Sequence, residues 1–210
     1  MLRYIPANQM NLHPKLRDTM FRDRADQFKT RLGWEVSVDT IGMERDEYDA
    51  MNPLYVIWEQ EDGSHGGSMR FMPTTGRTMV NDHFSYLNGD RLIQSDDIWE
   101  CTRFCIARGM SSKISSALML GGAEIGIGFG LSHSVGVFDD RMVRIYARLG
   151  WGPTILGAEG EGRGRISVGL WEFSDEVRNR LLLKSGVSSE ASSLWFRRAF
   201  GEQDRLAKIA

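Results

Sequence analysis

The chain has little of three residue types that often define a class of protein: its 210 residues include two cysteines, four histidines and five prolines. Cys101 and Cys105 stand four positions apart in one apolar segment, and in an extended strand that spacing is about 13 Å, too long for a disulfide. We therefore expect free thiols in a reducing compartment. The histidines lack the i, i+4 helical spacing of zinc sites, so no metal centre is predicted.

Long hydrophobic runs and an excess of charge of one sign are also missing. No apolar stretch approaches the roughly 20 residues of a membrane span, and the first residues lack the apolar core of a signal peptide. The 26 basic and 28 acidic residues give a formal net charge of -2, so no general attraction to nucleic acid or to an anionic membrane is expected. The length suits a single domain over residues 1–210, and we expect that domain to be cytoplasmic.

The hydrophobic pattern predicts a mixed α/β fold without internal repeats. Segment 121–130, "GGAEIGIGFG", is rich in glycine, but it follows a predicted helix instead of opening one. We interpret these glycines as positions of close strand packing and not as a phosphate-binding loop. The predicted strands are 2–5, 54–59, 68–72, 98–106, one or two within 124–138, and 165–173; the predicted helices are 14–32, one that begins at Ser111 or Ser112, 140–149, 174–183 and a terminal helix around "SLWFRRAF".

Charged residues interrupt several of these apolar segments. A charge buried without a partner costs more free energy than a short strand recovers, so each must be paired, hydrated or used. Taken singly, each is most simply a structural ion, and the acidic stretch "ERDEYDA" is most simply a solvated turn. Together they form a set that is able to neutralise itself in one cleft: Arg24, Arg70 and Arg103 with Asp46, Asp49 and Glu100.

Glu100 and Arg103 lie in the same predicted strand, "WECTRFCI". Three positions apart on a regular strand, they point to opposite faces of the sheet. Either a β-bulge brings them together or they serve different sides of a cleft, and the pattern leaves both arrangements open.

The order and spacing of these residues resemble the acyl-homoserine lactone synthases, which make diffusible signals for bacterial quorum sensing. The resemblance begins in "FRDRADQFKTRLGW" with Arg24, Phe28 and Trp34, and it continues through "ERDEYD" and "GSMRF". It ends with Phe84 and "ECTRF", so it covers positions 24–104.

The resemblance implies a GNAT-like three-layer α/β/α fold with a twisted mixed sheet splayed into a V-shaped cleft. It also implies two substrates, S-adenosylmethionine and an acyl thioester on acyl carrier protein, and no cofactor. After the central strand, "ARGMSSK" has one glycine where acetyl-CoA-dependent acyltransferases carry a glycine-rich pyrophosphate loop. This difference favours the carrier protein, and coenzyme A stays open as the alternative donor. Residues up to about 48 are expected to be mobile and to become ordered around the nucleotide.

Under this interpretation Glu100 takes the proton from the substrate amine through a water molecule. An amine with a pKa of roughly 8 is mostly protonated at neutral pH and must lose that proton before it attacks a thioester. The other implied roles are a catalytic charged wall around the methionine part of the substrate (Arg24, Asp46, Asp49, Arg70 and Arg103) and binding of S-adenosylmethionine (Arg24, Phe28, Trp34, Phe84 and Arg103).

The acyl chain is expected to be unsubstituted or 3-hydroxylated and of medium to long length. Gly136 stands where family members with 3-oxo signals tend to have a threonine, and a buried oxygen without that donor loses about 1–3 kcal/mol. The predicted acyl pocket is lined by Phe104, Leu118, Met119 and Gly136.

A basic helix face is the last candidate surface. Arg141, Arg144 and Arg148 follow i, i+3 and i+7 spacing on the predicted helix 140–149. This face either docks an acidic carrier protein or is simply solvated.

Two other functions remain as alternatives. One is a GNAT-like N-acyltransferase that uses acyl-CoA and a different amine, which product analysis with and without S-adenosylmethionine separates from the synthase. The other is a non-catalytic ligand-sensing module, in which the ionic network is structural and no thioester is turned over.

Overall fold

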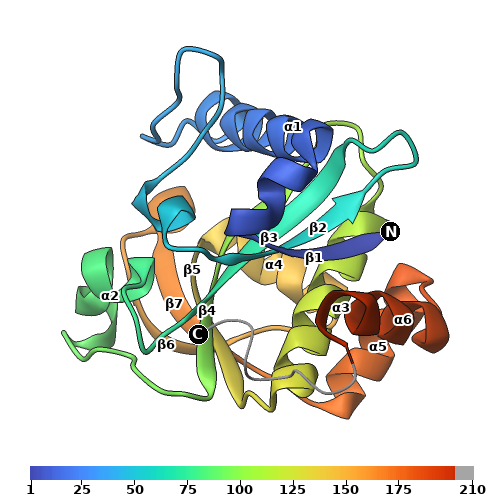
Figure 1. Ribbon diagram of the computed structural model, residues 1–210. Coiled ribbons are helices and arrows are strands. Elements are labelled where there is room, and N and C mark those ends of the chain that lie inside the picture. Colours follow the sequence, from blue (N-terminus) through green and yellow to red (C-terminus); the bar gives the residue numbers. More distant parts are fainter. Residues whose placement is uncertain (202–210) are drawn as a thin grey trace.

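The computed structural model describes residues 1–201 except the side chain of Arg163. A seven-stranded sheet forms its middle layer, in the order β1-β2-β3-β4-β5-β7-β6 (Figure 1). Neighbouring strands are antiparallel except β4 and β5, which are parallel, so the sheet is mixed as predicted. The strands are β1 (Leu2–Pro6), β2 (Leu54–Glu59), β3 (His65–Pro73), β4 (Ile98–Ile106), β5 (His133–Asp139), β6 (Thr154–Glu159) and β7 (Ile166–Glu172).

Helices cover both faces of the sheet, which confirms three layers (Figure 1). Met69 of β3 packs in one hydrophobic cluster with Leu118 of α3. Arg70, the next residue, points to the opposite face, where it shares the Asp49 carboxylate with Arg24 of α1. One face therefore carries α1 (Pro14–Ala25) and α2 (Met79–His83), and the other carries α3 (Ser112–Phe129), α4 (Asp140–Leu149), α5 (Asp175–Ser185) and α6 (Ser189–Phe200).

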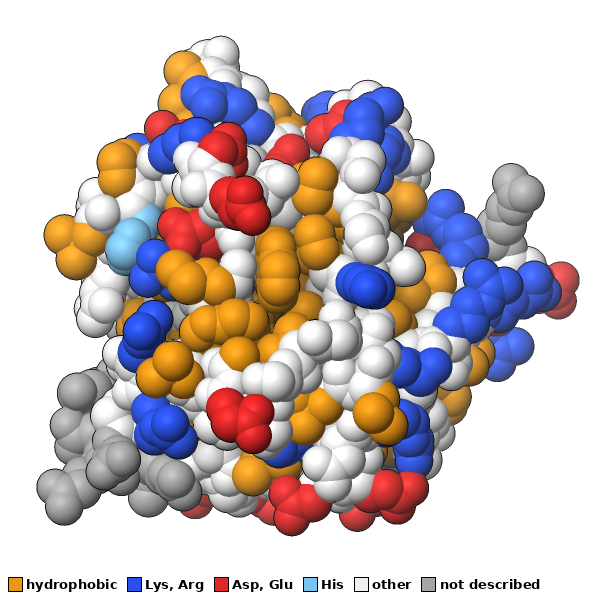
Figure 2. Space-filling model, turned by 90° about the vertical axis from the view of Figure 1, so that its right-hand side faces the viewer, with side chains coloured by type: hydrophobic (Ala, Val, Ile, Leu, Met, Phe, Trp, Pro, Cys, Tyr) orange, Lys and Arg blue, Asp and Glu red, His pale blue; other side chains and the backbone are white. Residues whose placement is uncertain are grey.

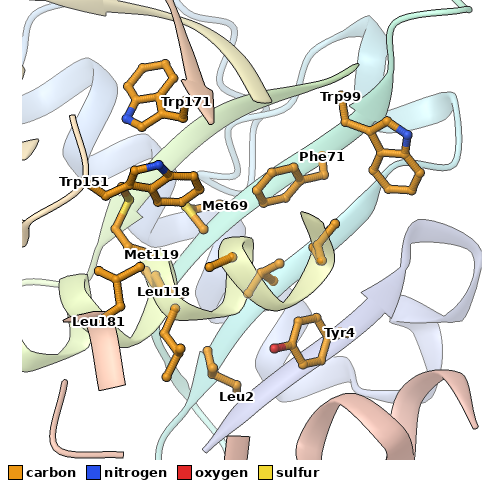
Figure 3. Close-up of a cluster of buried hydrophobic side chains, with 14 of the residues drawn as sticks. Leu2, Tyr4, Met69, Phe71, Trp99, Leu118, Met119, Trp151, Trp171 and Leu181 are labelled. Carbon is orange, nitrogen blue, oxygen red and sulfur yellow. The ribbon is translucent and has the colours of Figure 1, made fainter. Parts of the chain in front are cut away.

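The main hydrophobic core lies between the sheet and α3 (Figure 3). Aromatic residues such as Phe71, Trp99 and Trp171 fill it from the strands, and Leu118 and Met119 fill it from the helix. Burial of this apolar surface is the main term that stabilises the fold.

The parallel strands β4 and β5 part soon after they meet. They pair only from Ile98 to Glu100 on β4, opposite His133 to Val135 on β5. Beyond that point the Gln27 side-chain amide donates to the Phe104 carbonyl at 2.8 Å and accepts from the Ile106 amide at 2.8 Å. Backbone groups of β4 that lose their strand partner are thus satisfied by a side chain, and the predicted splayed cleft is present.

Two sequence predictions about secondary structure differ from the structure. The prediction of one or two strands within 124–138 is right for one strand, β5, but the first part of the segment is helical, because α3 continues to Phe129. The glycines of this segment allow close packing of a helix, not of strands: a Cβ at Gly126 or Gly128 would lie 2.1 Å from the ring of Phe173 or Phe196. The exposed edge strand β6 was not predicted at all.

The predicted mobile segment up to about residue 48 includes parts that belong to the framework. β1 pairs with β2 along its whole length, and α1 buries Leu16, Met20 and Arg24. Residues 33–42 are the exposed part, and their one strand-like contact is the isolated pair Val38–Glu44. The mobility of residues up to about 48 stays a prediction, and 33–42 is the most exposed part of that segment.

The surface carries no large region of a single charge on the face shown in Figure 2, where hydrophobic side chains gather near the centre and charges of both signs surround them. This distribution fits the near-zero net charge. None of the helices in residues 1–201 combines the length and the hydropathy that a membrane span needs.

Candidate active site

Arg24 is the fully buried centre of an ionic network on the α1 side of the sheet. Its Nε donates to Glu44 Oε2 at 2.6 Å, and its Nη1 and Nη2 donate to the two Asp49 oxygens at 2.9 Å each. Only 1% of Arg24 is exposed, and Glu44 is fully buried. A buried guanidinium of this kind is tolerated because every donor edge meets a carboxylate.

Arg70 and Arg103 extend this network along the sheet. Arg70 forms a two-point contact with Asp46, donates to Asp49 at 2.9 Å and donates from Nε to Thr102 at 3.0 Å. Arg103 donates to Glu44 at 3.0 Å and to Asp46 at 2.7 Å. Three guanidinium groups thus face three carboxylates, and their formal charges cancel.

Glu44 belongs to this network although the sequence prediction did not include it. Conversely, Glu100 was predicted to join the network but none of the three arginines binds it. Glu44 stands at the head of the acidic stretch "ERDEYDA", so the compositional signal was present. What the pattern does not show is that its backbone amide donates to the Phe21 carbonyl of α1, which turns the residue inward.

The acidic stretch is an ordered cap, not a solvated turn. Asp46 accepts from the backbone amides of Tyr48 and Asp49 and begins a short 3-10 helix over 47–50, and Asp49 accepts in return from the Asp46 amide. This capping box fixes both carboxylates. Burial pushes the pKa of Asp49 upward, but Arg24 and Arg70 outweigh it, so the pKa of Asp49 lies well below its usual range.

A β-bulge in β4 places Glu100 and Arg103 on the same face of the sheet. Ser68 pairs with Cys105 and Arg70 with Thr102, so β4 has one more residue than β3 between these pairs. Arg103 adopts a φ of 55°, an unfavourable conformation for a residue with a long side chain. The extra residue brings the Arg103 side chain to the same face as Glu100.

Glu100 is almost completely buried, and its carboxylate binds the beginning of α2. Oε1 accepts from the Val80 amide at 2.6 Å, and Oε2 accepts from the Met79 amide at 3.1 Å. Burial raises the pKa of Glu100 to about 7, although these two N–H groups lower it. The carboxyl group therefore changes its charge near neutral pH.

A cavity of about 380 Å³ opens where β4 and β5 part. Arg103 lies in its wall, whereas the neighbouring Glu100 does not. Among the residues that the structure describes, the one partner of Arg103 Nη1 is the Met79 sulfur, at 3.8 Å. One N–H edge of Arg103 is thus available to a negatively charged ligand in the cavity.

Phe28 and Trp34 stack at one side of this cavity. Their ring centroids are 5.2 Å apart with an angle of 12° between the planes, and the Arg103 guanidinium lies 5.5 Å from the Phe28 ring. Phe28 is buried and Trp34 is 40% exposed. Phe84, predicted beside them, lies in a separate cluster with Val80 and is not in the cavity wall.

The predicted acyl pocket is largely present. Phe104, Met119 and Gly136 line the cavity, but Leu118 does not. Leu118 precedes Met119 on α3 and points in a different direction. It packs under Gly67 of β3 and is fully buried in the core. The sequence prediction also missed large side chains that line the cavity from α4, β7 and the loop between α4 and β6: Met142, Tyr146, Trp151 and Trp171. Figure 3 shows the last two of these beside Met119.

The three arginines of α4 are differently placed. Arg141 lines the cavity and pairs with Asp139. Arg144 and Arg148 are exposed, and within residues 1–201 neither forms an ion pair. Val143 and Ile145, also partly exposed, add apolar surface to the same helix.

Both cysteines are free, as predicted. Burial raises the pKa of the Cys101 thiol far above its ordinary value, so this thiol in the cavity wall is a weak nucleophile.

A mixed sheet with helices on both faces, whose central parallel strands part around an apolar cavity, defines a GNAT-like acyltransferase. Residues 8–181 match the sequence profile of the family described as autoinducer synthase. The chain is 38% identical over 200 residues to the acyl-homoserine-lactone synthase of Rhizobium etli, covering 91% of this chain and 94% of the relative. It therefore belongs to the autoinducer synthase family, and acyl-homoserine-lactone synthesis is its activity.

Solved structures agree with this assignment. The acyl-homoserine lactone synthase LasI is 28% identical and superimposes with a TM-score of 0.75, covering 86% of this chain and 93% of that chain. The CoA-dependent synthase BjaI, solved with S-adenosylmethionine and isopentyl-CoA, has a TM-score of 0.80 at 23% identity and 90% coverage of each chain. The latter likeness concerns the fold alone.

Proposed function

We propose that this synthase acylates the amine of S-adenosylmethionine with an acyl group from acyl carrier protein and then closes the lactone, releasing methylthioadenosine. The observation that carries this proposal is the bulged Arg103. It presents an available N–H edge to the cavity, and its other N–H groups donate to Glu44 and Asp46 in a network of zero net charge.

S-Adenosylmethionine carries a carboxylate, an amine and a sulfonium cation. The available edge of Arg103 suits the carboxylate, because a charge-assisted hydrogen bond is strong in a site shielded from water. A network without net charge does not repel the sulfonium, and the stacked rings of Phe28 and Trp34 offer aromatic faces for the adenosine. Since Trp34 is partly exposed, it is free to move when the nucleotide enters.

Acyl transfer needs the amine in its neutral form. Glu100 does not line the cavity, so a water molecule has to carry the proton from the amine to its carboxylate. The pKa of about 7 gives that carboxylate a suitable basicity for this role. The amine nitrogen then bonds to the thioester carbonyl carbon, and the carrier thiol leaves with the electron pair of the broken C–S bond. An amide and a free thiol result.

Lactone closure uses the substrate's own groups. A carboxylate oxygen attacks the methionine γ-carbon, and the bond from that carbon to the sulfonium breaks. The electron pair goes to sulfur, so methylthioadenosine leaves as a neutral thioether. The contribution of the protein is to hold the two groups close together, which is where Arg103 acts.

Two features support acyl carrier protein as the donor. The exposed Arg144 and Arg148 form a local basic surface on α4, next to the cavity that Arg141 lines. At the start of α3, the Ser111 hydroxyl already accepts from the Lys113 amide, so this helix end offers one N–H fewer to a nucleotide diphosphate.

The test uses the purified full chain with S-adenosylmethionine and matched acyl thioesters of carrier protein and of coenzyme A. Mass spectrometry should detect acyl-homoserine lactone and methylthioadenosine in equal amounts, with a higher kcat/KM for the carrier-protein thioester. A higher kcat/KM for acyl-CoA would refute the choice of donor. Acylation of another amine without S-adenosylmethionine would refute the assignment of the amine substrate.

A further inference from the structure

One residue of the cavity wall, Met79, also contacts the buried carboxylate of Glu100. Met79 is the first residue of α2 and lines the cavity, whereas Glu100 does not. Its backbone amide donates to Glu100 Oε2 at 3.1 Å, and its sulfur accepts from Arg103 Nη1 at 3.8 Å. Met79 is therefore the point at which the cavity meets the carboxylate that has to receive a proton.

The sulfur of Met79 occupies the N–H edge of Arg103 that suits a substrate carboxylate. A thioether sulfur is a weak acceptor, and the contact of 3.8 Å is long. A carboxylate binds a guanidinium more strongly, at about 2.7–2.9 Å, so a carboxylate that enters this position displaces the sulfur. The side chain is able to move without the backbone, because methionine has three rotatable bonds and Met79 is only partly buried.

Glu100 itself is closed off from solvent. It is 1% exposed, and burial is the largest cause of its raised pKa, which Arg70 lowers and Asp46 raises. The charged and titratable side chains near Glu100, from β3, from β4 and from the acidic stretch 44–50, are Arg70, Cys101, Arg103, Asp46 and Tyr48. Entry of water is thus the change to which this carboxyl group is most sensitive.

We propose that Met79 acts as a gate between the cavity and Glu100. The carboxylate of S-adenosylmethionine displaces the Met79 sulfur from Arg103, and the displaced side chain admits the water molecule that connects the substrate amine with Glu100. This inference rests on the proposed function and adds a condition to it. The base becomes accessible only when a substrate with a carboxylate is bound at Arg103.

The proton transfer that the open gate permits is balanced. The ammonium group of the substrate gives one proton to the water oxygen, and that water gives another of its protons to Glu100. An ammonium and a carboxylate thus become a neutral amine and a carboxylic acid, and the water is unchanged. Before the substrate binds, the closed gate keeps bulk solvent away from the base, as a closed lid does in other active sites.

The first experiment observes the Met79 side chain by NMR of the full chain with ¹³C-labelled methionine methyl groups. The Met79 resonance is the one that is missing in Met79→Leu. Saturation with S-adenosylmethionine, without a thioester, should shift this resonance. Decarboxylated S-adenosylmethionine, which has no carboxylate for Arg103, should leave it near its position in the free enzyme. An unshifted resonance with S-adenosylmethionine, or equal shifts with both ligands, would overturn the inference, and neither result depends on whether a truncated variant folds.

The second experiment compares the pH dependence of kcat/KM for S-adenosylmethionine in the wild type, Met79→Ala and Met79→Leu. This parameter reports the free enzyme, in which the gate is closed in the wild type and missing in Met79→Ala. Water that reaches Glu100 in Met79→Ala should lower the midpoint of the acidic limb by about one pH unit or more, toward the ordinary glutamate pKa of about 4.3. Met79→Leu, with a side chain of similar volume, should retain the wild-type midpoint. The ionisation of the substrate amine is common to all variants, so it does not contribute to a difference between them.

Met142→Ala is the matched control, because it truncates a methionine that lines the same cavity from α4 instead of α2. It should leave the midpoint unchanged even if it alters the rate. An unchanged midpoint in Met79→Ala, or a shift of the same size in Met142→Ala, would contradict the gate. If no thioester yields a homoserine lactone, the proposed function itself fails, which is a different result from lactone formed by an enzyme in which Met79 does not move.

Discussion

Replacement of Arg24 by methionine, which has a similar length, tests the buried network most directly. The change removes hydrogen bonds of 2.6, 2.9 and 2.9 Å and leaves Glu44 and Asp49 with excess negative charge. Both keep some support, Glu44 from Arg103 and Asp49 from Arg70 at 2.9 Å and Tyr55 at 2.6 Å. Breaking a buried ion pair from one side costs about 3–5 kcal/mol, a large part of the roughly 5–15 kcal/mol that stabilises a domain.

Urea unfolding of the wild type and of Arg24→Met at pH 7 and at pH 5 measures this loss of unfolding free energy and the direction in which it changes with pH. In the wild type the lowered pKa of Asp49 contributes stability above the unfolded-state pKa near 4, and that stability is lost only at more acidic pH. In Arg24→Met the pKa of Asp49 should be higher than in the wild type, because the carboxylate loses the cation that lowers its pKa most. Protonation then relieves the excess negative charge, and the difference from wild type should shrink from pH 7 to pH 5. Glu100 titrates in both proteins, and its effect cancels in the comparison.

The matched control is Arg22→Met, an exposed arginine of the same helix. It should change the free energy of unfolding by no more than about 0.5 kcal/mol. The reasoning about the network would be refuted if Arg24→Met were as stable as this control at pH 7, or if its destabilisation were larger at pH 5 than at pH 7.

Three further predictions concern catalysis and binding. Glu100→Gln should lower turnover about 10²- to 10⁴-fold, with circular dichroism as a check on folding, and near-normal turnover in this variant would exclude Glu100 as the base. In the wild type, kcat/KM should rise as the pH increases through about 7. Charge reversal of Arg144 and Arg148 should raise the KM for acyl carrier protein and leave the KM for S-adenosylmethionine unchanged, and equal effects on both would contradict a docking role. Amide exchange in the segment up to about residue 48, and most of all in its exposed part 33–42, should slow when S-adenosylmethionine binds, whereas unchanged exchange would indicate a preformed pocket.

The sequence was most informative where charge interrupted an apolar pattern. Burial forces such residues to find partners, and Arg24, Arg70 and Arg103 do meet in one network. The same signal did not distinguish ionic partners from a helix cap. Glu100 also interrupts a strand, yet its partners are two backbone amides, which have no signature in the residue types.

Prediction failed where packing, not periodicity, decides the structure. Segment 121–129 has four glycines, an unfavourable composition for a helix, but its close contact with the sheet and with α6 overrides that preference. β6 is exposed along almost its whole length, so it lacks the alternation that marks a half-buried strand.

The sequence also did not predict the side chains that line the cavity from α4, from β7 and from the loop between α4 and β6. Met142, Tyr146, Trp151 and Trp171 come from α4, from β7 and from the loop between α4 and β6, and only the sheet order and the parting of β4 from β5 bring them to the cavity. No local spacing rule relates residues of these different elements, so their shared role could not be seen before the fold was known.

The glycines of α3 set a limit on how this enzyme can be stabilised. Glycine to alanine in a helix is a common stabilising substitution, worth about 1 kcal/mol from propensity alone. At Gly126 and Gly128 the added methyl group would overlap aromatic rings at 2.1 Å, and overpacking of this kind costs more than the propensity gains. α3 also carries Ser115 and Met119 into the cavity wall. Thermostability engineering that treats these glycines as weak points would push the helix outward and change the acyl preference together with the stability.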